Sequence, residues 1–145
     1  MRRNRRPVGY WAAAMFLGIG ITLTGCEATT PQAPEARFLL RACRWSGNPD
    51  GEMFRIALRD SAEIAAAERE LRERRGRIIS GRLARGDGGF NAPWHWHLLP
   101  DSTWVVDGAI EVCDGCPSGV EERLDAWLAF GGFCPWTTEF IAREQ

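Results

Sequence analysis

The sequence has 145 residues, a length typical of one domain. A hydrophobic content of 45% and a charged content of 26% exclude a disordered chain, a collagen-like repeat and a polytopic membrane protein. The formal net charge is −1, but all 18 basic residues are arginine and four of them lie in the first six positions. Without that segment 14 arginines face 19 acidic residues, a net charge of −5, which argues against nucleic acid as a partner.

Residues 1–25 have the three parts of a secretory signal peptide. Arginines within 2–6 form a basic start, and residues 10–23 form an apolar run that is shorter than the about 20 residues of a membrane-spanning helix. Residues 23–26, Leu-Thr-Gly-Cys, resemble the bacterial lipobox. The resemblance implies cleavage before Cys26 and acylation of Cys26 with fatty acids such as palmitate. The alternative, an ordinary signal peptide with a chance cysteine, is disfavoured because Cys26 falls where the apolar run ends.

Residues 26–36 are expected to be the lipidated cysteine and a flexible tether, because two prolines and small polar residues cannot bury enough surface to fold. Position 27 is Glu rather than the Asp that marks retained Gram-negative lipoproteins, which favours the outer membrane. We therefore expect an exported protein that is anchored to the cell membrane by its lipid and faces the periplasm or the surface. The folded domain is expected over residues 37–145.

Hydrophobic periodicity and turn residues predict the elements of this domain. Strands are expected at residues 37–44, 52–59, 78–85, 94–99, 104–113 and 137–142. Turns are expected at 46–51, between two strands of a hairpin, and at 100–102. Helices are expected at 62–75, capped by Asp60 and Ser61 and ended by Gly76, and at 118–130, preceded by Pro117. These elements do not alternate as βαβ units, so the predicted fold is α+β, a mainly antiparallel sheet of about five to six strands with two helices in a single small domain.

Several segments between residues 90 and 141 carry a pattern of Trp, His, Cys and Asp. The segments are 90–98, 100–101, 109–114, 117–122 and 133–136. They resemble a family of small exported domains of undefined activity, found as the N-terminal domain of slime-mould proteins named for calmodulin binding. The resemblance implies a compact domain but no substrate or site. His95 and Gly119 depart from the pattern, and calmodulin binding is not transferred, because a bacterial lipoprotein is not expected to meet that partner.

Four further cysteines, an even number, suit disulfides in an exported domain. Cys43, Cys113, Cys116 and Cys134 allow three connectivities, among which the sequence does not choose. We expect two structural bridges, or one bridge and two buried thiols. A bridge from Cys43 would close a loop of about 70 residues or more, worth roughly 4 kcal/mol in the chain-entropy model.

Two alternatives give these residues a chemical role. Cys113 and Cys116 form a Cys-x-x-Cys sequence before a predicted helix, whose N-terminus would stabilise a thiolate, so one alternative is thiol–disulfide exchange. The other alternative is metal binding, either by the four cysteines or by His95, His97, Glu111 and Asp114. Disulfides and an ordinary polar strand face are the favoured interpretations, so no metal or other cofactor is expected.

The folded domain contains six tryptophans. Five fall mostly at apolar-face positions and are expected in the core: Trp94, Trp96, Trp104, Trp127 and Trp136. Trp45 lies beside a turn and is expected to be exposed. The candidate ligand surface comprises Trp45, Trp94 and Trp96, whose rings could stack on a sugar or bind a peptide.

No Ser–His–Asp motif, phosphate-binding loop or helical His-Glu-x-x-His sequence is present. The sequence therefore predicts a lipid-anchored cell-envelope protein, not an enzyme, whose small domain binds or scaffolds an unknown protein, peptide or glycan. Its expected partners are the membrane, through the lipid, and that ligand.

Overall fold

The computed structural model describes residues 35–145, which belong to one compact unit. The predicted signal peptide, Cys26 and most of the predicted tether lie outside the described residues. None of the helices within residues 35–145 combines the length and the apolar character needed to cross a bilayer.

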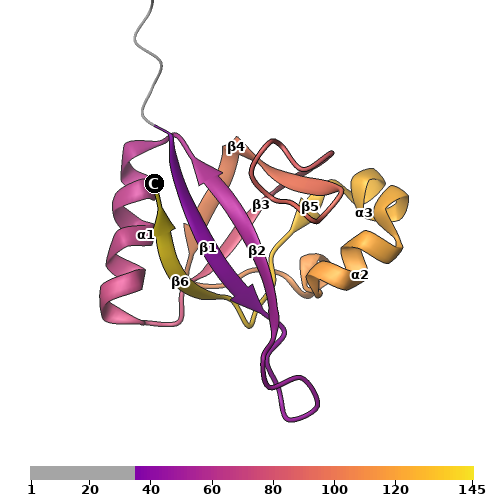
Figure 1. Cartoon of the computed structure of the whole chain (residues 1–145), viewed down its shortest axis with the longest axis horizontal. Helices are drawn as coiled ribbons and strands as arrows, with labels where there is room; N and C mark the ends of the chain where they lie inside the picture. Colours follow the sequence, from indigo (N-terminus) through magenta and orange to yellow (C-terminus); the bar gives the residue numbers. More distant parts are fainter. Residues whose placement is uncertain (1–34) are drawn as a thin grey trace, which may run out of the picture. The chain divides into compact units, whose positions relative to one another are not determined.

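Six strands form two antiparallel sheets rather than one. The first sheet has the order β2-β1-β6, with β1 at Ala36–Ala42, β2 at Glu52–Leu58 and β6 at Glu139–Glu144. The second has the order β4-β3-β5, with β3 at Ile78–Arg85, β4 at Trp96–Val106 and β5 at Gly132–Phe133. Figure 1 shows the first sheet in front of the second, with helix α1 on one side and helices α2 and α3 on the other. The predicted α+β class is confirmed.

The first sheet is amphipathic, as the alternation in its sequence predicts. In β1 the even-numbered residues 36–42 are buried and the odd-numbered residues between them are half-exposed. Pairing of Ala36 with Leu58 and of Ala42 with Glu52 keeps the apolar faces of β1 and β2 on one side. The sheet therefore presents one apolar face to the second sheet.

An aromatic cluster joins the two sheets. The fully buried rings of Phe54, Trp96 and Phe133 come from three strands, with ring centroids 6.0 Å apart for Phe54–Trp96 and 5.2 Å apart for Trp96–Phe133. Tilted and edge-on ring pairs of this kind contribute about 0.5–1.5 kcal/mol each beyond their buried area. The core thus depends on residues far apart in the chain.

Helix α1, at Ser61–Glu73, begins as predicted. The Asp60 carboxylate accepts hydrogen bonds from the backbone N–H groups of Ala62 and Glu63 at 2.8 and 3.1 Å. The helix ends earlier than predicted, because Arg74, not Gly76, is its C-cap and adopts the left-handed conformation with φ of 49°.

The two strands predicted at 94–99 and 104–113 are one strand, β4, which ends at Val106. The pairing shifts from Leu83–Leu98 to Gly81–Thr103, so residues 99–102 bulge out of the ladder and do not reverse the chain. The Thr103 hydroxyl donates to the Leu99 carbonyl at 2.8 Å and closes the bulge. A short 3₁₀ helix, η1 at Glu111–Cys113, replaces the end of the second predicted strand.

The helix predicted at 118–130 is two helices, α2 at Pro117–Glu122 and α3 at Leu124–Phe130. Arg123 breaks it with φ of −128° and ψ of 38°. The break lets the indole N–H of Trp127 donate to the Gly119 carbonyl at 3.1 Å while its ring meets the ring of Phe133 edge-on. The last strand begins at Glu139, two residues later than predicted.

Candidate functional site

The four cysteines of the domain form two disulfides, Cys43–Cys116 and Cys113–Cys134. The prediction of disulfides is confirmed. The alternative in which Cys113 and Cys116 share an exchangeable bond is wrong for this structure, because each is bonded to a cysteine from another part of the chain. Cys43 lies at the end of β1 and Cys134 follows β5.

An open cleft of about 560 Å³ lies beside the Cys43–Cys116 bridge. It is lined by residues from the β1–β2 turn, the segment before β6 and the turn after α1: Arg44, Trp45, Pro49, Gly76, Trp136, Thr137, Thr138 and Glu139. We call it the Trp45–Trp136 cleft. Its volume is in the range of small-ligand sites.

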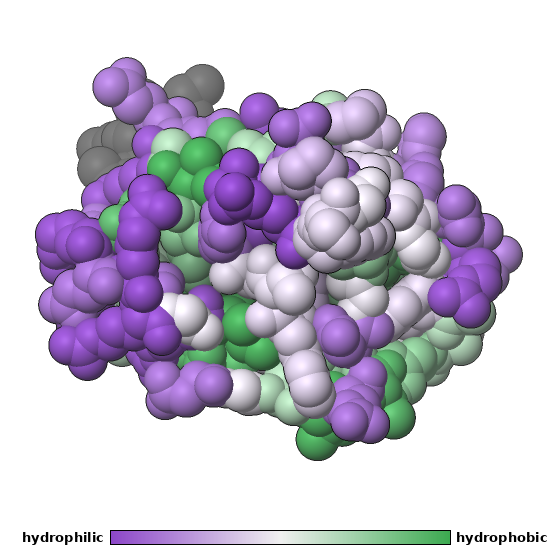
Figure 2. Space-filling view, turned by 90° about the horizontal axis from the view of Figure 1, so that it is seen from below, coloured by the Kyte–Doolittle hydropathy of each residue, from purple (hydrophilic) through white to green (hydrophobic). Residues whose placement is uncertain are grey.

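Two large aromatic side chains are exposed in this cleft. Trp45 is 53% exposed and Trp136 is 44% exposed, although burial of a tryptophan is ordinarily favourable. The β1–β2 turn points down in Figure 1, and Figure 2 views the domain from that side. This face has a broad band of residues of near-neutral hydropathy between hydrophilic ones.

Both tryptophans are held by short contacts. Trp45 and Asn48 exchange backbone hydrogen bonds of 3.2 and 2.9 Å, and the Asn48 side chain donates to the Cys43 carbonyl at 3.1 Å. The indole of Trp45 lies so close to Gly47 that a Cβ there would be 2.9 Å from Nε1. The backbone N–H of Trp136 donates to the Asp114 carboxylate at 2.9 Å. The cleft is therefore largely preformed.

The charged groups of the cleft are paired with one another. The Glu139 carboxylate accepts a hydrogen bond from Arg41 at 2.5 Å and a longer one from Arg44 at 3.5 Å. The hydrogen bond from Arg41 lowers the pKa of Glu139 below its usual value and outweighs the opposing effect of burial. Glu139 is therefore an ionised acceptor at neutral pH, which suits ligand binding better than proton transfer.

Of the predicted ligand surface, only Trp45 lines this cleft. Trp96 is fully buried, so its place on a ligand surface is wrong, and Trp94 is half-buried with its indole N–H donating to the Met53 carbonyl at 2.8 Å. The core prediction is wrong for Trp136 and for Trp104, which is 45% exposed, while Trp127 is half-buried.

Sequence reasoning missed Trp136, although a signal was present. Trp45 and Trp136 each follow a cysteine by two residues, in Cys-Arg-Trp and Cys-Pro-Trp. Both cysteines are bridged to the segment 113–116. The two bridges thus bring two indoles 91 positions apart in the chain to one cleft.

The predicted metal ligands do not come together. Within residues 35–145 no group of three or more His, Cys, Asp or Glu side chains is placed to hold a metal ion. His97 Nδ1 lies 2.7 Å from the Gly86 carbonyl, and Asp114 caps Trp136. The alternative site of His95, His97, Glu111 and Asp114 is therefore wrong, as is a four-cysteine site, because those cysteines are in disulfides.

His95 instead pairs with Glu121 on α2. The His95 ring lies 2.5 Å from one carboxylate oxygen, and its backbone N–H donates to the other at 3.0 Å. Burial raises the pKa of Glu121, but the two hydrogen bonds from His95 outweigh it and leave the pKa below its usual value. The pair joins the loop before β4 to α2 and is a structural contact.

The same loop covers the free edge of β2. The fully buried Asn91 accepts a hydrogen bond from the Arg55 backbone N–H at 2.7 Å and donates one to the Trp96 carbonyl at 2.8 Å. Covering a strand edge in this way removes unpaired backbone groups that would invite aggregation. The segment 90–98, which carried much of the family pattern, thus builds the fold.

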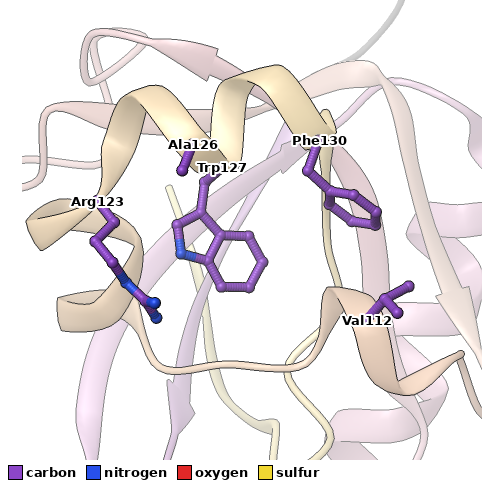
Figure 3. A pocket seen from close by; sticks show the side chains of 5 residues that line it. All are labelled: Val112, Arg123, Ala126, Trp127 and Phe130. Carbon is purple, nitrogen blue, oxygen red and sulfur yellow. The ribbon is translucent and has the colours of Figure 1, made fainter.

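A second, smaller hollow of about 210 Å³ lies between η1 and α3. Figure 3 shows the ring of Trp127 between Arg123 and Phe130, with Val112 on the opposite side. Trp127 already uses its indole N–H on Gly119, and Val112 and Phe130 are exposed. This hollow offers mainly apolar contact, whereas the Trp45–Trp136 cleft offers aromatic and polar contact together.

Comparison with known proteins gave one match. A family model for the N-terminal domain of a protein named for calmodulin binding matches residues 40–145. The family resemblance expected from the sequence is thereby confirmed. Searches of curated proteins and of solved structures found no match. The matched range includes both disulfides and the whole Trp45–Trp136 cleft.

Proposed function

The chain belongs to this family of calmodulin-binding-protein N-terminal domains, and on that premise we propose that it is a lipid-anchored cell-envelope protein whose domain binds a ligand in the Trp45–Trp136 cleft without transforming it. One observation carries the proposal: two exposed, firmly held indoles flank one cleft. Exposed aromatic side chains in a preformed cleft gain contact area on binding at a low cost in conformational entropy.

The location rests on the sequence and on the cysteines. Residues 23–26 resemble a lipobox, and Cys26 is the proposed site of acylation. Two disulfides are consistent with export, because such bonds persist in oxidising compartments. We place the protein on the outer membrane, with the domain facing the periplasm or the surface.

Binding, rather than catalysis, is supported by the state of the polar groups in the cleft. Glu139 is paired with two arginines, and the Thr137 hydroxyl accepts a hydrogen bond from the Cys43 backbone N–H at 2.7 Å. A general base or a nucleophile needs an activating partner, and these contacts hold the groups in structural hydrogen bonds instead.

The test uses the purified full-length protein in detergent and separated polysaccharide, peptide and lipid fractions of the cell envelope. At least one fraction should change the tryptophan fluorescence in a saturable way. Trp45→Ala and Trp136→Ala should each weaken this response at least tenfold. Trp104→Ala is the matched control, since Trp104 is exposed to the same extent as Trp136 but lies outside the cleft. Equal responses from all three variants would contradict the proposal.

A further inference from the structure

The Trp45–Trp136 cleft has an unusual lining, because its apolar surface comes only from rings. Trp45, Trp136 and Pro49 supply it, and no Leu, Ile, Val, Met or Ala side chain lines the cleft. A peptide is ordinarily recognised by pockets that enclose its aliphatic or aromatic side chains. A pyranose ring has instead a flat face of C–H groups, which fits the face of an indole, and a rim of hydroxyls.

We propose that this cleft binds an uncharged oligosaccharide of pyranose units, with Trp45 and Trp136 stacking on two sugar rings of one chain. The inference rests on the proposed function, since it names the class of ligand for the same cleft. It makes specific use of the polar groups that lie between the two indoles.

Those polar groups match a rim of hydroxyls. The Arg44 guanidinium and the Glu139 carboxylate are planar and partly exposed, so each can form paired hydrogen bonds with neighbouring hydroxyls. Within the described residues the indole N–H groups of Trp45 and Trp136 have no hydrogen-bond partner, and both remain available as donors. The cleft thus offers donors and acceptors beside each stacking surface.

The charges favour an uncharged chain. The Glu139 carboxylate would repel an anionic sugar, and Arg41 and Arg44 would repel a cationic one. Because the three groups compensate one another largely, the cleft presents hydrogen-bonding capacity with little net charge.

Rigidity lowers the cost of binding. The Arg44 side chain is oriented by a hydrogen bond from Nε to the Pro49 carbonyl at 3.1 Å, and the turn that carries Trp45 is bonded to Cys43 and Asn48. Few side chains therefore need to be ordered when a ligand binds, which favours the weak, shallow sites in which sugars are held.

The test titrates full-length protein in detergent with three neutral hexasaccharides: β-1,4-linked N-acetylglucosamine, β-1,4-linked glucose and α-1,4-linked glucose. A proline-rich decapeptide is titrated alongside them. At least one hexasaccharide should bind saturably by calorimetry. Trp45→Ala and Trp136→Ala should each weaken binding at least tenfold, and Trp104→Ala should leave it within twofold. Trp45→Tyr, which keeps a stacking ring, should weaken binding less than Trp45→Ala and so separates loss of stacking from loss of folding.

Three results would overturn the inference: no hexasaccharide binds, a hexasaccharide binds equally well to the two alanine variants of the cleft, or only the peptide binds. The last result, or saturable binding of a non-polysaccharide envelope fraction that depends on Trp45 and Trp136, would leave the proposed function standing. If neither defined sugars nor any envelope fraction depends on the two tryptophans, both proposals fail.

Discussion

Single side chains decide how the loop before β4 closes the domain. Asn91 occupies a fully buried position between two strands and satisfies one backbone donor and one backbone acceptor. Its role could not be read from the sequence, because an asparagine between Phe90 and Pro93 looks like ordinary turn chemistry. Only the three-dimensional meeting of β2 and β4 gives it two partners.

Asn91→Ala should lower the free energy of unfolding by about 3 kcal/mol, because the N–H of Arg55 and the carbonyl of Trp96 both lose their partner. Asn48→Ala is the control, since Asn48 makes one side-chain hydrogen bond at a half-exposed position, and it should cost about 1 kcal/mol. Urea unfolding measures both. Equal midpoints for the two variants would show that Asn91 does not bridge the strands.

Glu139 gives a pH dependence with a defined sign. Its pKa is lower in the folded state than in the unfolded chain, mainly because of the hydrogen bond from Arg41. It therefore stabilises the fold above the ordinary glutamate pKa of about 4.3, and this contribution is lost as the pH falls through the lower, folded-state value. Glu139→Gln should be less stable than wild type at pH 7, and the difference should shrink in acid.

Urea midpoints measured from pH 7 to pH 2 test this expectation. Glu111→Gln is the control, because Glu111 is exposed and forms no ion pair within residues 35–145. A difference between Glu139→Gln and wild type that stays constant over the whole range would contradict the assigned pair.

Secondary-structure elements show where sequence patterns suffice and where they fail. Strands β1, β2 and β3 and helix α1 were predicted within one or two residues, because each carries a local periodicity or a cap. β5 was missed because two residues have no periodicity. The break at Arg123 follows from the contacts of Trp127 with Gly119 and Phe133, which are tertiary. The candidate site was half predicted for the same reason: Trp45 lies at a recognisable turn, whereas Trp136 reaches the cleft through bridges that the sequence leaves open.

The two disulfides hold these elements together with different loop lengths. Cys43 and Cys116 are 73 residues apart, and Cys113 and Cys134 are 21 apart. In the chain-entropy model the first bridge contributes roughly 4 kcal/mol and the second roughly 3 kcal/mol. Replacing both cysteines of a pair by alanine should therefore destabilise the domain more for Cys43 and Cys116, as measured by guanidinium unfolding.

Peptide mapping without reductant supplies the control for that comparison. Each double variant should keep the other bridge, and the wild type should give a peptide pair joining Cys43 to Cys116. A pair joining Cys113 to Cys116 would instead restore thiol–disulfide exchange as an interpretation.

The whole molecule combines a covalent address with a surface for recognition. The predicted mature chain is acidic, and the outward face of the first sheet is covered by ion pairs such as Arg55–Glu144 at 2.9 Å. Exposed pairs of this kind add little stability but keep a surface soluble. The exposed rings of the Trp45–Trp136 cleft stand out against this charged surface, which is why the proposed ligand contact is placed there.

Anchoring is the part of the proposal that acts on the whole chain. Cys26→Ser should abolish incorporation of an alkyne-labelled palmitate and move the protein out of the membrane fraction, because acyl chains bind bilayers with about 0.8 kcal/mol per buried methylene. The Cys113→Ala/Cys134→Ala variant is the control and should keep the label, since its cysteines are bridged in the folded domain. Labelled protein after Cys26→Ser would mean that the chain is acylated elsewhere, and unlabelled wild-type protein in the soluble fraction would mean that residues 1–25 are an ordinary signal peptide.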